Sequence, residues 1–186
     1  MTFGPGLRKL VLIVHLVLSI GWIGAVIAYL ALDVAAVNAD ADGARMSSMA
    51  MSLIGWWVIV PLAVSSLLTG LLMALGTPWG LFRHYWVLIS FLLTTLAVVV
   101  LITHLADVSP MAQTARTPHA GSAERAPRSD FLHAGGGLVV LLFVTALNVY
   151  KPRGLTPYGW RKQNEAISAS GSARRPRIPP APRPPS

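Results

Sequence analysis

Four long apolar runs constrain the fold of this chain more than any other feature. They cover residues 10–32, 52–75, 84–106 and 131–150. Each is close to the ~20 residues that an α-helix needs to cross ~30 Å of hydrocarbon. Lipid leaves a spanning backbone few ways to satisfy its hydrogen bonds, and a helix does so within one segment. A mean hydropathy of +0.59 supports this class. The sequence therefore predicts an all-α bundle of four transmembrane helices.

The rest of the chain divides into connections and a tail. We expect residues 1–163 to form the membrane domain, with loops on one side at residues 33–51 and at the Pro- and Ser-rich residues 107–130. Residues 164–186 are rich in Pro, Ser and Arg and contain too few apolar residues to form a core. This tail is predicted to be disordered.

Basic residues are distributed unequally between the two sides of the predicted bundle. Arg8, Lys9, Arg83 and the basic residues after the last run lie on one side, whereas the other side carries most of the acidic residues. The positive-inside rule then places both termini in the cytoplasm. There the basic tail would contact anionic lipids of the inner leaflet, which explains a pI of about 10.9 without nucleic acid.

The side chains that could hold a cofactor are few. The absence of cysteine excludes disulfides, thiolate metal sites, iron–sulfur clusters and c-type haem attachment. Four histidines lie within or at the ends of the apolar runs. At 1.5 Å per residue they sort into an inner pair, His15 and His84, and an outer pair, His104 and His133. We expect His84, at a helix end beside Arg83, to be a surface residue.

The outer pair suggests a haem site. His104 and His133 lie on consecutive antiparallel helices at one depth, and three glycines, at positions 135–137, follow His133. Two imidazoles from facing helices can hold b-type haem, with the glycines leaving room for the macrocycle. Alternatively, the histidines bond loop carbonyls and the glycines let another helix pack closely. The sequence leaves both interpretations open.

His15 lies on a polar and aromatic stripe of the first helix. At 100° per residue Trp22 falls within about 20° of His15, so both should face the bundle interior or a wet cavity. A neutral imidazole there could ligate a cofactor, relay protons or only pack. Gly21, Gly24 and Ala28 lie on the opposite side. Small residues of this spacing allow close approach of another helix, from a second copy or a membrane partner.

Two features of the second run lead to further predictions. Met46, Met49 and Met51 precede it, and thioethers at this spacing suit Cu(I), although they also serve as flexible apolar contacts. Pro61 lies in mid-span. Because proline lacks an amide hydrogen and frees the carbonyl of Trp57, we expect a kink there.

Two resemblances follow from these residues. The pattern of His15, Trp22 and Gly24 resembles the first helix of copper-resistance protein D and of the four-helix protoporphyrinogen oxidase of bacterial haem synthesis. Residues 7–163, with IGWWVIVPLA, HAGGGLVVLL and NVYKPRGLTPYGWRKQ, resemble an uncharacterised family of bacterial predicted integral-membrane proteins. The first resemblance implies a role of His15 in haem or metal handling, and the second implies the bacterial cytoplasmic membrane.

Three functions are compatible with the sequence. The first is binding of b-type haem or copper through His15, Trp22, His104 and His133, or for copper also Met46, Met49 and Met51. The second is an accessory membrane protein without cofactor. The third is an enzyme that oxidises a porphyrin, which we expect less because the spans contain no lysine or acidic residue to partner a porphyrinogen.

Overall fold

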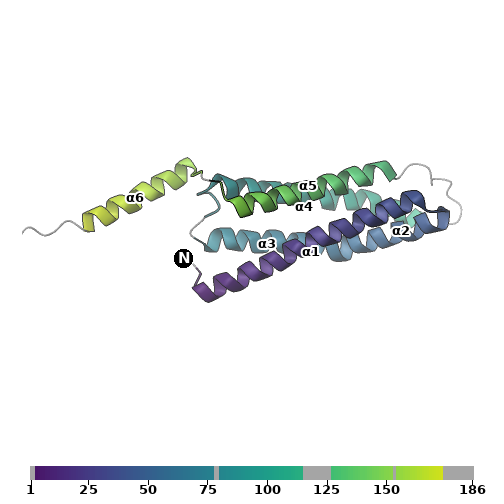
Figure 1. Ribbon diagram of the computed structural model, residues 1–186, viewed down its shortest axis with the longest axis horizontal. Coiled ribbons are helices and arrows are strands. Elements are labelled where there is room, and N and C mark those ends of the chain that lie inside the picture. The colour runs from purple at the N-terminus through teal and green to yellow at the C-terminus, as the bar shows by residue number, and fades with distance from the viewer. Residues whose placement is uncertain (1–2, 78–79, 115–126, 153, 174–186) are drawn as a thin grey trace, which may run out of the picture.

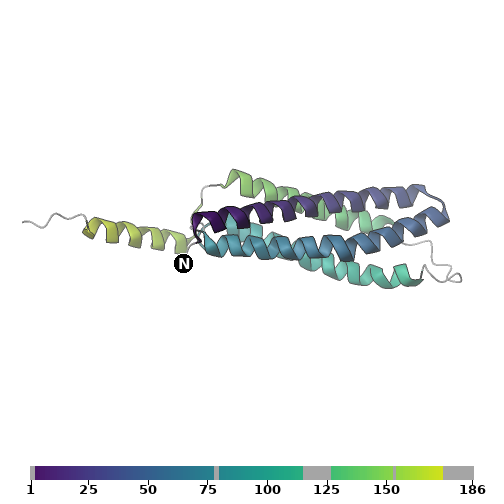
Figure 2. The ribbon, with the colours of Figure 1, turned by 90° about the horizontal axis from the view of Figure 1, so that it is seen from below.

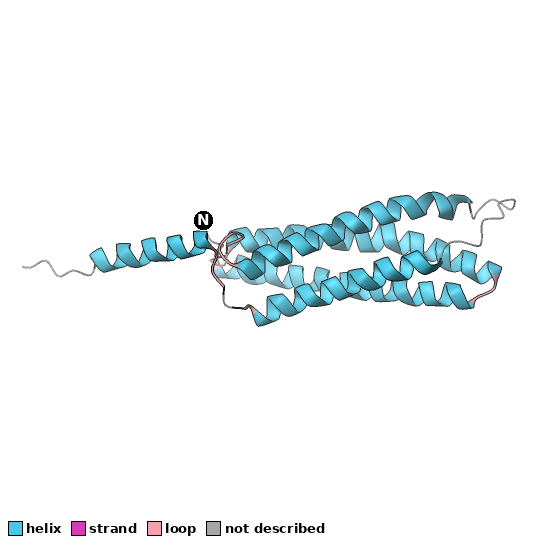
Figure 3. Ribbon diagram, turned by 90° about the horizontal axis from the view of Figure 1, so that it is seen from above, coloured by secondary structure: helices cyan, strands magenta, loops and turns pink. Residues whose placement is uncertain are grey.

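The chain is helical throughout the part that the structure describes. This computed structural model describes residues 3–77, 80–114, 127–152 and 154–173 (Figure 1). Its elements are α1 (Pro5–Asn38), α2 (Ala41–Ile54), η1 (Gly55–Ile59), α3 (Val60–Gly76), α4 (Tyr85–Thr114), α5 (Pro127–Tyr150) and α6 (Pro157–Ala173). Over these residues there is no strand, only one isolated bridge between His84 and Leu155 (Figure 3). The predicted all-α class is confirmed.

Four segments are long and apolar enough to cross a membrane, as predicted. They are Pro5–Asn38, Ala41–Gly76, Tyr85–Ala106 and Phe131–Tyr150. In Figure 1, α1 runs beside α3 and α2, and α4 runs beside α5. We call the end that holds the start of α1 and the end of α5 the proximal end, and the opposite end the distal end. The protein is therefore a multi-pass membrane protein whose α1 begins on the side where α5 ends.

The helices extend beyond the apolar runs, which corrects the expected loops. The first helix ends at Asn38, the segment expected as an outer loop is largely α2, and α4 continues to Thr114. Residues 115–126 of the other expected loop lie outside the described residues. The carboxylate of Asp40 accepts the Gly43 amide hydrogen at 2.9 Å and caps α2. An apolar run marks only the part of a helix that faces hydrocarbon. A search for apolar runs therefore misses polar turns at the helix ends.

The expected disorder from residue 164 onward is wrong for its first part. The helix α6 continues to Ala173, and in Figure 1 it projects from the proximal end. Its N-terminus is capped, because the hydroxyl of Thr156 accepts the Gly159 amide hydrogen at 3.1 Å. No proline interrupts the chain between Pro157 and Pro176. Residues 174–186 lie outside the described residues.

The distortion expected at Pro61 takes the form of a π-helical turn. In η1 the Val60 amide donates to the carbonyl of Gly55, five residues back. This wider turn leaves Pro61 in the first turn of α3, where an amide hydrogen is not needed. A Cβ on Gly55 would lie 2.6 Å from Leu105 Cδ2, so the missing side chain lets α4 pack there. As Figure 2 shows, α2, η1 and α3 still run on as one long rod.

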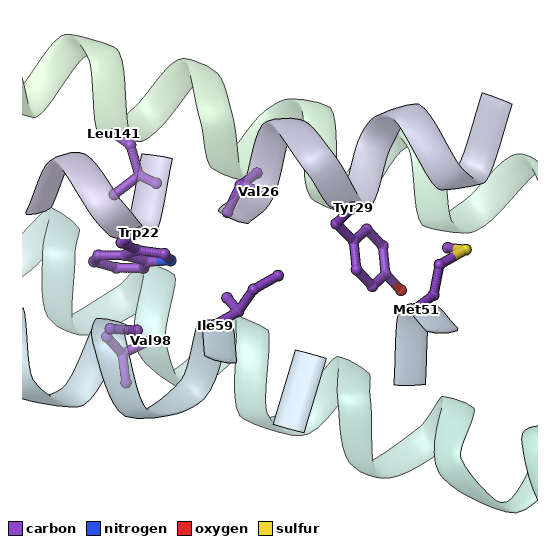
Figure 4. Packing of buried hydrophobic residues seen from close by; sticks show 8 residues of the cluster. Trp22, Val26, Tyr29, Met51, Ile59, Val98 and Leu141 are labelled. Carbon is purple, nitrogen blue, oxygen red and sulfur yellow. The ribbon is translucent and has the colours of Figure 1, made fainter. Parts of the chain in front are cut away.

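The core lies between the helices in two clusters, and most other apolar side chains face outward. The larger cluster, shown in Figure 4, consists of Trp22, Val26, Tyr29, Met51, Ile59, Ala63, Val98 and Leu141. A smaller one near the proximal end consists of Ala74, Leu81, Trp86 and Val87. Exposed Leu, Ile and Val side chains cover the spans. In water such a surface would be unfavourable, but in a bilayer it meets lipid tails.

The proximal end is closed by contacts between distant parts of the chain. The Phe3 amide donates to the Gly76 carbonyl at 3.0 Å, and the Phe3 ring occupies the place of a Gly76 side chain. The Thr156 amide donates to the Arg83 carbonyl at 3.1 Å, and its hydroxyl donates to the Phe82 carbonyl. These bonds fix the start of α6 on the connection between α3 and α4.

This arrangement makes Gly159 intolerant of a side chain. A Cβ there would overlap the Arg83 carbonyl oxygen, which belongs to the backbone and cannot rotate away. We expect Gly159→Ala to lower the free energy of unfolding by about 1–3 kcal/mol, as overpacking does, and to expose residues 150–156 to protease.

The matched control is Gly154→Ala, whose Cβ would make an ordinary 3.7 Å contact with the Tyr85 ring. Thermal unfolding in detergent and limited proteolysis would measure both effects. Equal stability and equal cleavage of the two variants would contradict this account of the contact.

Candidate functional site

The distal half of the bundle encloses a cavity of about 300 Å³. It lies between α1, η1, α4 and α5. Most of the side chains around it are aliphatic, among them Ile59, Leu101 and Leu141. Cavities that bind small molecules begin at about this volume and combine an apolar lining with a few polar groups. The polar groups of this lining therefore decide what the cavity can bind.

Two of these groups are aromatic residues of α1. Trp22 and Tyr29 are seven residues apart, and Val26 lies between them on the same face. Figure 4 shows Tyr29 pointing from α1 toward Met51, with Trp22 two turns away on the same helix. Trp22 is 3% exposed and Tyr29 is 5% exposed. Each presents a ring to the core and carries one polar atom that can donate a hydrogen bond.

The other polar groups are the two histidines of the outer pair. His104 of α4 and His133 of α5 both line the cavity. Their rings are stacked, with centroids 4.2 Å apart and planes inclined by 13°. The structure therefore brings together the two residues that the sequence placed at one depth on consecutive helices.

This stacking bears on how the pair could hold haem. In a bis-imidazole site each ring points a nitrogen edge-on at an iron that lies between the two rings. Here the rings of His104 and His133 face each other across 4.2 Å. An iron between them would meet ring faces, which carry no lone pairs. Ligation by both histidines therefore requires the rings to separate, whereas ligation by one does not.

The three glycines after His133 are surrounded by open space. A Cβ built on Gly135, Gly136 or Gly137 meets no atom within 4 Å. Gly136 and Gly137 line the cavity. Within the described part of the chain, no other helix therefore packs closely against these glycines. The missing side chains of Gly136 and Gly137 instead enlarge the cavity next to the histidine pair.

His15 lies elsewhere, at the contact between α1 and α3. Its Nδ1 is 3.1 Å from the Ser66 carbonyl oxygen and 3.0 Å from Thr69 Oγ. A carbonyl can only accept, so Nδ1 carries the hydrogen. Gly70 leaves room for the ring, since a Cβ there would lie 3.1 Å from His15 Cε1. His15 thus joins two helices and does not line the cavity that Trp22 lines.

The predicted copper ligands do not share a surface. Met46 is 71% exposed, whereas Met51 is 5% exposed and belongs to the core cluster near Tyr29 (Figure 4). Met49 is half-buried. In addition, no group of three His, Asp or Glu side chains with metal-binding proximity occurs among the described residues. The geometry gives the copper hypothesis little support.

The small-residue face of α1 is used in part within the bundle. A Cβ on Gly21 would contact Leu62 of α3 at 3.5 Å, whereas one on Gly24 would meet nothing within 4 Å. Ala28 is exposed. Gly21 therefore packs inside the molecule, and a partner helix at Gly24 and Ala28 stays a prediction.

The sequence interpretation overlooked Tyr29 and misjudged Asp33. Residue 33 begins the first loop expected from the sequence, but α1 continues to Asn38, and Asp33 is only 3% exposed. It lies one turn beyond Tyr29, on the buried stripe that begins with Trp22 and Val26. Their spacing of four, three and four residues was the available signal. The statement that the spans contain no acidic residue is therefore wrong.

The contacts of His15 predict a structural effect of its removal. We expect His15→Ala to lower the free energy of unfolding by about 0.6 to 1.7 kcal/mol, the range of hydrogen bonds between membrane helices. Because His15 lies outside the cavity, the same variant should keep any bound ligand. Unfolding in mixed micelles and ligand content would be measured together.

A double-mutant cycle with Thr69→Val tests the partner. The losses in the free energy of unfolding from His15→Ala and Thr69→Val should be less than additive, because both substitutions remove the hydrogen bond between His15 Nδ1 and Thr69 Oγ. The control is Ser90→Ala on α4. Its effect on the free energy of unfolding should simply add to that of His15→Ala. Loss of ligand with unchanged stability in His15→Ala would contradict the structural role.

Comparisons with known proteins complete the description of the site. No protein-family model, curated protein sequence or solved structure matches the chain.

Proposed function

We propose that the protein binds a flat, largely apolar ring compound in the distal cavity, with His104 and His133 as its polar contacts, in the bacterial cytoplasmic membrane. One observation carries this proposal. Open space along Gly136 and Gly137 ends at a stacked pair of imidazoles inside an otherwise apolar lining. No other histidine of the described residues lines this cavity.

The open space is informative because membrane helices normally pack closely. Small residues in spans usually lie where two backbones approach, which recovers van der Waals contact. Gly136 and Gly137 have no such neighbour. Unfilled space also forfeits the dispersion contacts of its lining, so an empty cavity destabilises the fold. A ligand that fills the space would restore those contacts.

The orientation of the protein follows from the proposed location. The described basic residues gather at the proximal end, except for Arg45 on α2 and Arg128 on α5. We place the proximal end in the cytoplasm, where Arg161 and Lys162 of α6 and the basic residues after it would contact anionic lipids. The cavity then lies in the outer half of the membrane.

Haem b is one member of the proposed ligand class. It is flat and mostly apolar, and one imidazole of the pair could serve as axial ligand without rearrangement. Copper has less support because Met51 is buried in the core. Oxidation of a porphyrin stays an alternative, since Asp33 provides a buried acidic residue near the distal end. A cofactor-free accessory role predicts a cavity that is empty after purification.

The glycines provide a direct test of the cavity. Gly137→Leu should fill the space that Gly137 leaves open and reduce the co-purifying ring compound at least tenfold. Gly135→Leu is the matched control, because Gly135 also has open space around it but does not line the cavity. The measurement combines a reduced-minus-oxidised visible spectrum with mass analysis of an organic extract.

Several outcomes of this experiment are decisive. A near-stoichiometric compound that is lost only in Gly137→Leu would support the proposal. Wild-type protein from haem-replete cells that carries no ring compound would overturn it and favour the accessory role. Equal loss in both variants would show that the cavity is not the binding site.

If the compound is haem b, the histidines can be assigned separately. A bis-imidazole site should lose its low-spin α and β bands in both His104→Ala and His133→Ala. A site with one axial imidazole should lose them in only one variant. His15→Ala should keep the bands, since His15 bonds α3. Retention of the bands in both His104→Ala and His133→Ala would exclude the pair as ligands.

A further inference from the structure

We infer that the ring compound is a quinone with a long prenyl tail, which reaches the cavity sideways from the bilayer between α4 and α5. This inference rests on the proposed function and names the chemical class of its ligand. It follows from the side on which the cavity opens, from its volume and from the kind of polar atoms around it.

The exposure of the lining residues shows where the cavity opens. Leu96 of α4 and Leu132 of α5 line it and are 59% and 75% exposed. Leu105 and Leu141 also line the cavity, on the opposite edges of α4 and α5, and are 3% and 6% exposed. The opening therefore lies on the outward-facing edges of α4 and α5, within the segments that face hydrocarbon.

An opening into hydrocarbon selects for lipid-soluble ligands. A molecule that approaches from the bilayer must already partition into it, and a long apolar tail can stay among the lipid chains while the ring enters. Haem carries two carboxylates, which need water or cationic partners. No Lys or Arg of the described residues lines the cavity. The surroundings thus suit a ligand that is uncharged.

The volume favours a small ring system. A volume of about 300 Å³ lies at the lower end of the range for small-molecule sites. One or two fused rings with the first carbons of a tail fit such a space. A tetrapyrrole has several times as many atoms and would extend beyond this space.

The polar atoms of the lining suit carbonyl oxygens. Trp22 lines the cavity and offers its indole N–H as a donor. The oxygens of a quinone accept hydrogen bonds and carry no charge. The stacked rings of His104 and His133 also show that flat rings can lie face to face at this place. Binding alone is inferred, and no oxidation or reduction is assigned.

A retention experiment with two probes tests this inference. Wild-type protein in mild detergent is incubated with a long-tailed ubiquinone or with its tail-less ring analogue and then repurified. Bound quinone is measured by ultraviolet absorption and mass analysis of an extract. We expect about one long-tailed ubiquinone per protein, at least tenfold less in Gly137→Leu, and an unchanged amount in Gly135→Leu. All samples are also examined for haem by difference spectroscopy.

The outcomes separate the inference from the proposed function. Haem without quinone in the wild type would overturn the inference and leave the proposed function intact. Neither compound, and no other ring compound in the extract, would overturn both. Retention of only the tail-less analogue would contradict the lateral opening. Equal retention by the two glycine variants would place the quinone in surrounding lipid and would also overturn the inference.

Discussion

The helices of this protein must associate without the hydrophobic effect, because lipid tails are as apolar as the side chains they replace. Close packing and a few hydrogen bonds therefore decide how the bundle is held. The contact of His15 with Ser66 and Thr69, beside the 2.7 Å bond between Ser19 and Ser66, joins α1 to α3 in the proximal half. Two turns beyond His15 on α1, Trp22 already borders the cavity. This contact holds α1 against α3, so it belongs to the packing of the bundle and not to the lining of the cavity.

The cavity combines features that each have another explanation in isolation. Glycines in a span usually serve packing, histidines near a span end usually bond loop carbonyls, and exposed leucines usually only face lipid. Here the glycines have no neighbour, the histidines stack on each other, and the leucines border an opening. Their coincidence on α4 and α5 is what supports a binding site. Asp33 lies one turn beyond Tyr29, so a buried carboxylate and the cavity share one face of α1.

Much of the fold could be predicted from the sequence, because span length and apolar content follow directly from the thickness of a bilayer. Helix ends could not, since the Asp40 and Thr156 caps and the polar turns of α6 carry no hydropathy signal. Sequence position also paired His104 with His133, because depth follows from the rise per residue. It could not separate His15 from the cavity. The helical wheel places His15 and Trp22 on one face, but which helix that face meets changes along α1, and only tertiary packing determines the change.

The proximal contacts have a consequence for how the protein is made. The amide of Phe3 bonds the last turn of α3, and Thr156 bonds the connection between α3 and α4. During synthesis Phe3 leaves the ribosome long before Gly76, and Thr156 follows only after all four spans have been translated. The start of α1 therefore stays without its partner until the second span has been made. Closure of the proximal end is therefore a late step of biogenesis. Substitutions at residues 154–159 that break these contacts should leave the four spans inserted with the proximal end still open.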